Sequence, residues 1–216
     1  MLTLVIGNKA YSSWSLRPWI LLATLHIPFE EKQVNLYDEP GKKKLKRLSP
    51  TGKVPLLIDG EIEVWESVAI FEYLAEKYPA KGIWPKTRAA RAEARALVAE
   101  MHAGFMAMRR HLPTNFRREV RLRELMPEVV ADVARMEAAW AGARRKFGKG
   151  GPFLFGKFSA ADAMFAPVVN RLHIYDVKVK KETRAYMDAI MALPAWQAWI
   201  KDAFAEKQTH EVYDAI

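Results

Sequence analysis

The chain of 216 residues contains no cysteine. This absence excludes a disulfide framework, a zinc–thiolate site, a CxxC redox motif and a cysteine nucleophile. A chain of this length can bury a core without disulfides, so the composition fits a reducing compartment and we expect a cytoplasmic protein. The sequence also has no apolar run near the roughly 20 residues of a membrane span. Its first residues, MLTLVIGNKAY, lack the pattern of a signal peptide, and we expect no membrane partner.

Charge is distributed unevenly along the chain. Residues 1–80 hold 10 basic and 10 acidic side chains, whereas residues 81–216 hold 24 and 15 and carry the whole formal net charge of +9. A basic half can bind nucleic acid or an acidic surface. Acidic residues are interspersed and no nucleic-acid-binding motif occurs, so a solvated helical surface is the better interpretation.

Hydrophobic periodicity divides the chain into two parts. The first part predicts a strand, a helix, a strand, a basic turn or short helix, a hairpin with an Asp-Gly turn and an amphipathic helix. These strands and helices are expected at 2–6, 16–25, 29–36, 54–58, 61–65 and 67–78. After two prolines and a glycine, helical periodicity predicts helices at 88–111, 127–147, 159–175, 182–192 and 195–206. We therefore expect a mixed β-α-β-β-β-α domain over 1–79, a linker over 80–87 and an all-helical domain over 88–216.

Three serines surround Trp14 between the first strand and the first helix: Ser12, Ser13 and Ser15. A hydroxyl at this place lies near unpaired N–H groups and the positive end of a helix dipole, which suits an anion. The structural alternative is that Ser13 or Ser15 caps the helix while Ser12 is a loop residue.

Two further places in the first part suit an extended, charged ligand. A cis bond between Val54 and Pro55 would turn the Val54 backbone outward to pair with an extended peptide, although most X–Pro bonds are trans. Glu66 and Ser67 begin a helix, where N–H groups and the serine hydroxyl bind a carboxylate and the glutamate accepts from an ammonium. The structural alternative at the second place is a plain helix cap.

Ser159 and Asp162 form a capping box at the start of a helix in the second part, with aspartate in place of the usual glutamate. We interpret this pair as structural.

Taken together, these features resemble the glutathione transferase family, and most of all its serine-dependent zeta- and tau-like bacterial members. The resemblance rests on SSWSLRPW at 12–19, VPLLIDG at 54–60, ESVAIFEYL at 66–74 and the Ser159 box. It implies a thioredoxin-like N-terminal domain, a helical C-terminal domain and a homodimer. It also implies glutathione as co-substrate, no metal, and a small hydrophobic electrophile that is attacked by the glutathione thiolate.

The resemblance assigns roles to particular residues. Ser12 matches the catalytic serine, whose hydroxyl would donate to the glutathione sulfur and lower the pKa of its thiol; Ser13 is the alternative. The glutathione-binding residues are implied to be Lys53 for the glycine carboxylate, Val54 for the cysteinyl backbone, Glu66 and Ser67 for the γ-glutamyl end, with Pro55 cis beside them. Lys42 is a weaker alternative to Lys53.

The electrophile pocket is implied to lie against the first loop and the first long helix. The candidates are Trp14, His102, Phe105, Met106 and Arg109, the last four of which would share one helical face at spacings of three and four. The structural alternative for Phe105 and Met106 is core or dimer packing.

Two departures from the zeta pattern lower the rank of an isomerase. Trp14 stands where the zeta motif has cysteine, and Ile174 stands where zeta-type maleylacetoacetate isomerases have an arginine, while Arg171 is placed at a different helical angle. We therefore rank a transferase of alkyl or aryl groups first and a glutathione-dependent isomerase or dehalogenase second. A non-catalytic glutathione-binding or regulatory relative is the further alternative.

Overall fold

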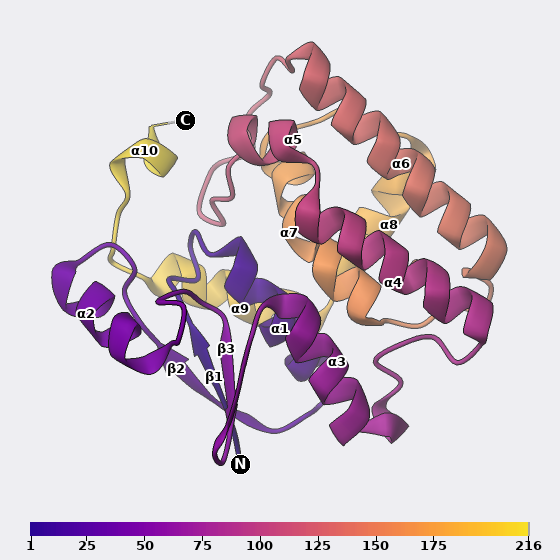
Figure 1. Ribbon diagram of the computed structural model, residues 1–216. Helices are drawn as coiled ribbons and strands as arrows, with labels where there is room; N and C mark the ends of the chain where they lie inside the picture. The colour runs from indigo at the N-terminus through magenta and orange to yellow at the C-terminus, as the bar shows by residue number, and fades with distance from the viewer. Residues whose placement is uncertain (216) are drawn as a thin grey trace.

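The computed structural model describes residues 1–215, in which a small sheet with its helices lies beside a larger helical part (Figure 1). The elements are β1 (Leu2–Ile6), α1 (Ser13–Thr24), β2 (Phe29–Gln33), α2 (Glu39–Leu48), β3 (Leu56–Asp59), β4 (Ile62–Trp65), α3 (Ser67–Lys77), the 3-10 turn η1 (Pro79–Lys81), α4 (Arg88–Ala103), α5 (Met106–His111), α6 (Pro127–Phe147), α7 (Ala160–Ile174), α8 (Lys181–Met191), α9 (Pro194–Ala205) and α10 (Glu211–Asp214). Within this described range, no helix is both long and apolar enough to cross a bilayer.

The sheet has the order β2-β1-β3-β4. β1 runs parallel to β2 and antiparallel to β3, with Val5 opposite Leu56, and β3 pairs with β4 as a hairpin. β1 is central and nearly all apolar because its side chains are buried on both faces of the sheet. This arrangement, followed by the helical part, confirms the predicted thioredoxin-like fold and its helical partner. The basic stretch predicted as a turn or short helix is the ten-residue helix α2.

The helix α7 is the centre of the helical part. All of its residues except His173 are buried, and it packs against both α1 and α4. The carboxylate of Asp162 lies at its start and accepts hydrogen bonds from the Leu154 N–H at 3.0 Å, the Ser159 N–H at 2.9 Å and the Ser159 hydroxyl at 3.0 Å. Burial raises the pKa of Asp162 to about 6. A buried carboxylate with three donors therefore fixes where this central helix begins.

The stretch 80–87, predicted as a linker, is packed against the core over part of its length. Ile83 and Trp84 are buried and belong to the hydrophobic cluster that runs through both parts of the chain. The Ala160 N–H donates to the Ile83 carbonyl at 2.9 Å, which joins this stretch to the first turn of α7. The domain boundaries at 79 and 88 remain predictions.

The helix predicted over 88–111 is interrupted, and this corrects the sequence analysis. α4 ends at Ala103, Phe105 takes a left-handed conformation with φ of 58°, and α5 begins at Met106. At Gly104 a Cβ would lie 2.8 Å from the Glu100 carbonyl oxygen, so the chain turns at a residue without a side chain. The four residues predicted on one helical face therefore belong to two helices and the turn between them.

Replacement of Asp162 by alanine tests the start of α7. The variant leaves the buried N–H groups of Leu154 and Ser159 unpaired, at about 1–3 kcal/mol each, so we expect urea denaturation to show a loss of about 2–5 kcal/mol. Asp162→Asn keeps one acceptor oxygen and should lose less. Because the folded pKa is raised, the wild type should also lose stability relative to Asp162→Asn as pH rises from about 4 to about 6. An unfolding free energy unchanged in the alanine variant would contradict this account.

Candidate active site

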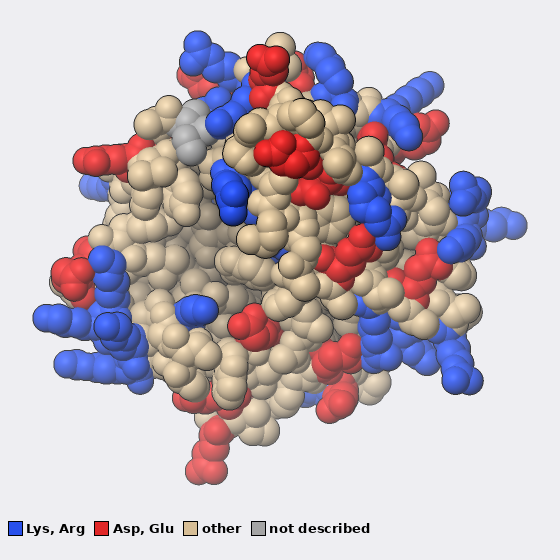
Figure 2. All heavy atoms as spheres, turned by 45° about the horizontal axis from the view of Figure 1, so that its top comes forward, with Lys and Arg blue, Asp and Glu red and all other residues tan. Residues whose placement is uncertain are grey.

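Two adjoining cavities form a cleft between the sheet domain and the helical part. The larger has a volume of about 690 Å³, the smaller about 280 Å³, and both are lined by Trp14, Lys53 and Val54. Figure 2 shows this face hollowed near its middle, with mostly uncharged walls and Lys or Arg side chains above and below the hollow. Predicted residues in the larger cavity are Ser12, Ser13, Trp14, Lys53, its alternative Lys42, Val54, His102, Met106 and Arg109, and the smaller one adds Pro55 and Glu66. Ser67 lines neither cavity.

Ser12 is the N-cap of α1, whereas the sequence left this role to Ser13 or Ser15. Its Oγ accepts from the Ser15 N–H at 3.3 Å and lies 2.7 Å from the Ser15 Oγ, which in turn accepts from the Gly7 N–H at 2.9 Å. The Ser13 hydroxyl makes no hydrogen bond to any residue in 1–215. Two hydroxyls therefore lie at the positive end of α1: that of Ser12 is hydrogen-bonded to Ser15, and that of Ser13 has no partner in residues 1–215.

The Val54–Pro55 peptide bond is cis, and Val54 lies outside the β-ladder, which begins at Leu56. Neither the N–H nor the C=O of Val54 pairs with another described residue. Its main chain is thus available to a ligand in the cleft.

The start of α3 borders the smaller cavity. Glu66 is the N-cap residue with φ of 67°, and its side chain is half exposed. The neighbouring Ser67 is fully buried, and its hydroxyl has no partner among the described residues. An unpaired buried hydroxyl at a helix N-terminus is matched by a ligand that brings an acceptor such as a carboxylate.

Trp14 lies among cations. The guanidinium carbon of Arg17 is 4.2 Å from the centre of its ring, and that of Arg109 is 5.0 Å away. Arg17 is 1% exposed and donates from Nε to the Met164 carbonyl of α7, while Arg109 donates to the carbonyls of Met101 and Gly104 at the end of α4. Burial lowers the pKa of both guanidinium groups. At Arg17 the positive charges of Arg109 and Arg171 lower the pKa further. The tryptophan ring is the favourable partner that two crowded cations share.

Arg171 joins this cluster from α7, although it stands at a different helical angle from position 174. It lines the larger cavity and donates from Nη1 to the carbonyls of Leu112 and Arg109. Its other guanidinium nitrogens donate to no residue in the described part of the chain. No aspartate or glutamate of residues 1–215 lines the larger cavity, so its field is positive.

His102 faces the cleft from the last turn of α4. Its ring centre is 5.4 Å from that of Trp14, and its Nε2 is 3.5 Å from a carboxylate oxygen of Glu66. Burial, followed by the positive charges of Arg17 and Arg109, lowers the pKa of His102, while Glu66 opposes the shift. The imidazole is therefore mostly neutral at pH 7.

Phe105 does not join this cleft, which corrects its place among the pocket residues. Its side chain is 8% exposed, belongs to the hydrophobic core and does not line either cavity. Met106 does line the cavity and is 60% exposed. The core-packing alternative holds for Phe105 and fails for Met106.

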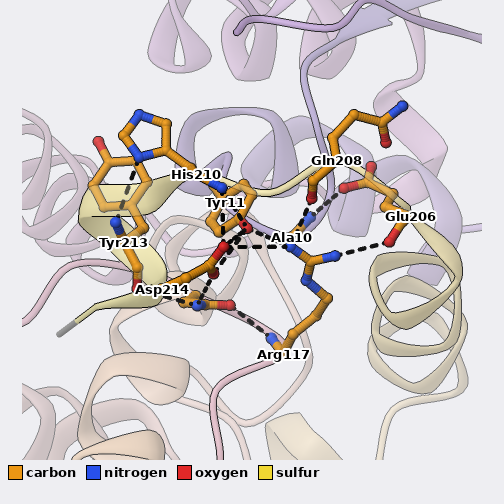
Figure 3. A network of polar contacts seen from close by, with 9 residues as sticks. Ala10, Tyr11, Arg117, Glu206, Gln208, His210, Tyr213 and Asp214 are labelled. Carbon is orange, nitrogen blue, oxygen red and sulfur yellow. Dashed lines mark hydrogen bonds and ion pairs between the residues drawn. The ribbon is translucent and has the colours of Figure 1, made fainter.

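The C-terminal segment supplies a wall that the sequence analysis missed. Tyr213 lines the larger cavity, and the Tyr11 hydroxyl donates to the Asp214 carboxylate at 2.8 Å (Figure 3). Arg117 donates to the Tyr11 hydroxyl and to the carbonyls of Glu206 and Gln208. These contacts bind the C-terminal segment, including α10, to Tyr11, which precedes α1.

Comparisons with known proteins agree with this geometry. The model of the glutathione S-transferase N-terminal domain matches residues 11–77, that of the C-terminal domain matches 119–202, and together they span more than half of the chain. A glutathione transferase homolog from Burkholderia, solved with bound glutathione, is 25% identical at a TM-score of 0.69 and covers 95% of this chain and 99% of that one.

Two curated proteins with similar sequences carry different enzyme names. A probable maleylacetoacetate isomerase of Caenorhabditis elegans is 40% identical over 101 residues, which are 46% of each chain. Glutathione S-transferase Z2 of Arabidopsis thaliana is 27% identical over 93% of this chain and 92% of that one. The chain spans about half the length of the curated isomerases it matches first.

The two hydroxyls at α1 are distinguished by stability. Ser12→Ala removes the helix cap and the partner of Ser15, so we expect the unfolding free energy to fall by about 1 kcal/mol, within the 0.5–2 kcal/mol of lost caps. Ser13→Ala removes no hydrogen bond and should change it by less than about 0.5 kcal/mol. Urea denaturation of both variants measures the difference; equal losses would show that Ser12 is not the cap in solution.

Proposed function

Because the chain belongs to the glutathione S-transferase family, we propose that it binds glutathione in this cleft and directs the thiolate at a small electrophile that carries a carboxylate. The observation that carries this proposal is the cleft itself, in which the α1 hydroxyls, the free Val54 main chain and the start of α3 adjoin a cavity without acidic side chains. Glutathione would supply a thiol that adds to an electrophilic carbon once it is deprotonated.

Four groups of this chain support the glutathione proposal. The main chain of Val54 pairs with the extended cysteinyl part, because both of its polar groups lack partners among the described residues. The buried hydroxyl of Ser67 donates to the γ-glutamyl carboxylate, and Glu66 accepts from its ammonium. Lys53 lines both cavities and lies where it can pair with the glycine carboxylate.

We assign to Ser12 the hydroxyl that donates to the glutathione thiolate, because this hydroxyl belongs to a hydrogen-bond network with Ser15 and the Gly7 N–H. In the structure the Ser12 hydroxyl donates to the Ser15 Oγ at 2.7 Å, and a rotation of this hydroxyl would redirect its proton to the glutathione sulfur. The Gly7 N–H then supports Ser15 from the other side. A hydrogen bond from the Ser12 hydroxyl to the sulfur would favour the charged form of the sulfur and so lower the pKa of the thiol.

The positive charge of the larger cavity indicates the kind of second substrate that it binds. The larger cavity contains Arg171 with unused donors, Arg109, and a Trp14 ring held between cations, with no acidic residue of 1–215 in its lining. A carboxylate bound there removes part of the mutual repulsion of the guanidinium groups, so an anionic electrophile is favoured over a neutral one. The proposed second substrate is therefore a hydrophobic electrophile, as the resemblance implied, that also carries a carboxylate.

A glutathione-dependent isomerase is the second candidate. Arg171 supplies a guanidinium to the cleft although Ile174 stands at the position of the zeta arginine, and a relative is named as a probable maleylacetoacetate isomerase. Trp14 in place of cysteine remains a departure from the zeta pattern. In such a reaction the sulfur–carbon bond forms, the former double bond rotates, and the same bond breaks again, so no glutathione is consumed. Measuring free glutathione during turnover of maleylacetoacetate separates isomerisation from conjugation.

A homodimer is the assembly we propose, as in the family. Ile62 and Trp65 of the edge strand β4 are 50% and 42% exposed and offer apolar surface for a second copy.

Titration with reduced glutathione tests the proposed site and its serine. Calorimetry should show saturable binding, and ultraviolet thiolate absorbance should place the bound thiol roughly one to three units below the usual pKa of about 8.5. Ser12→Ala should raise that pKa and reduce turnover, while Ser13→Ala should change both little. A loss confined to Ser13→Ala would move the role to Ser13, and a folded protein that binds no glutathione would refute the site.

Arg171→Met tests the anionic substrate. We expect KM for maleylacetoacetate to rise about tenfold to a hundredfold, because a hydrogen bond to a charged group contributes about 1.5–3 kcal/mol. KM for the neutral electrophile 1-chloro-2,4-dinitrobenzene should stay within about twofold, and Arg171→Lys should restore part of the loss. Arg145→Met, at an exposed position of α6, is the matched control. Equal effects on both electrophiles would show that Arg171 only shapes the fold.

A further inference from the structure

Thr114, in the loop between α5 and α6, carries a hydroxyl that the fold leaves without a partner. The residue is 4% exposed, and its Oγ1 forms no hydrogen bond within residues 1–215. It also lines the larger cavity of the cleft. A buried hydroxyl without a partner lowers the stability of a fold, whereas an apolar group of the same shape does not. The position of this hydroxyl is therefore explained by a molecule that enters the cavity and accepts a hydrogen bond from it.

The loop that carries Thr114 is held on both sides of this residue. Before it, the Pro113 carbonyl accepts a hydrogen bond from the Tyr175 hydroxyl at 3.0 Å. After it, the Phe116 N–H donates to the Ala10 carbonyl at 2.8 Å, which places the loop beside the residues that lead into α1. Threonine is also branched at Cβ, so few rotamers are open to its side chain. The fold thus directs the hydroxyl before any ligand arrives.

Arg171 holds the same loop from α7. Its Nη1 donates to the Leu112 carbonyl, two residues before Thr114, and its remaining nitrogens donate to no residue in the described part of the chain. Arg171 and Tyr175 are four positions apart, so both anchors of the loop come from one face of α7. Arg171 and Thr114 both line the larger cavity, where no acidic side chain of residues 1–215 competes for them. Two donors with unused capacity are therefore held to one loop at this cavity.

We propose that the Thr114 hydroxyl and the Arg171 guanidinium bind the same carboxylate of the second substrate, so that Thr114 is a specificity-determining residue. This inference rests on the proposed function and adds a second donor to it. A carboxylate has two oxygens, of which one accepts from the guanidinium and the other from the hydroxyl. A substrate without the carboxylate would leave both donors unpaired in a cavity from which it has displaced water, and a site of this kind discriminates strongly against it.

Calorimetry with two glutathione conjugates tests the inference without turnover. S-(1,2-dicarboxyethyl)glutathione carries carboxylates close to the sulfur, and S-butylglutathione has a four-carbon chain without them. Thr114→Val keeps the shape of the side chain and removes the hydroxyl. It should weaken the affinity for the dicarboxylate conjugate about tenfold, because hydrogen bonds to charged groups are the stronger class, and change the affinity for the butyl conjugate by less than about twofold. Equal losses for the two conjugates, or no loss for either, would overturn the inference.

Two further threonine variants control for the shape of the side chain. Thr114→Ser keeps a hydroxyl and should retain most of the affinity for the dicarboxylate conjugate. Thr24→Val removes a hydroxyl that also lacks a partner among the described residues, but it lies at the end of α1 and lines neither cavity, so both affinities should stay unchanged. Because Thr114→Val breaks no hydrogen bond within residues 1–215, its urea midpoint should not fall below that of the wild type. A lower midpoint with equal losses for both conjugates would assign Thr114 to the fold and refute its role in specificity.

The Thr114→Val/Arg171→Met double variant tests whether the two groups share one carboxylate. Groups that hold the same acceptor are coupled, so the double variant should lose less affinity for the dicarboxylate conjugate than the product of the two single losses. Losses that multiply would show that the two groups bind separately and would contradict the shared carboxylate. A wild type that binds glutathione while Thr114→Val loses nothing refutes this inference alone. A folded wild type that binds neither glutathione nor the conjugates refutes the proposed function, and the inference with it.

Discussion

The buried carboxylate of Asp162 is the contact on which both the fold and the cleft depend. It fixes the start of α7 through the N–H groups of Leu154 and Ser159, and α7 is the helix that the rest of the helical part surrounds. Further along the same helix, Met164 provides the carbonyl that holds Arg17 beneath Trp14, and Arg171 reaches the cleft. Because a helix is rigid, a shift at its first turn would move the arginines at the site.

The arginines around Trp14 show how the chain accommodates charge that it does not neutralise. Arg17 and Arg171 are buried, yet their recorded partners are backbone carbonyls rather than carboxylates. Carbonyl oxygens and an aromatic face solvate a guanidinium without cancelling its field. The positive potential therefore remains available to whatever enters the cleft, which an internal ion pair would have prevented.

Local signals account for most of what the sequence could predict. Strand alternation, the Asp-Gly turn and the apolar helix faces identified the sheet domain, and the motif at residues 12–19 located the start of α1. The break after Ala103 was not foreseen, because Met101 to Arg109 reads as one helix until the Gly104 turn and the Arg109 hydrogen bonds to its carbonyls are seen together. The wall formed by Tyr213 was also missed, since the contact between Tyr11 and Asp214 joins residues 203 positions apart, beyond any periodic signal. The access of Arg171 to the cleft was not predicted, because it depends on the loop at Leu112, whose carbonyl accepts from its guanidinium, and not on helical angle alone.

The absence of cysteine affects how the cleft would withstand the reaction that we propose for it. The function we propose would expose the side chains of the cleft to alkylation and arylation by soft electrophiles, and thiols are the first groups to react. Here Trp14 occupies the place where zeta members have cysteine, and the chain contains no thiol of its own, so self-inactivation by that route is closed. Oxidants meet the next softest atom, a thioether sulfur. Met106 lines the cleft and is 60% exposed, so oxidative damage at the site would appear there as methionine sulfoxide, a lesion that reductases reverse.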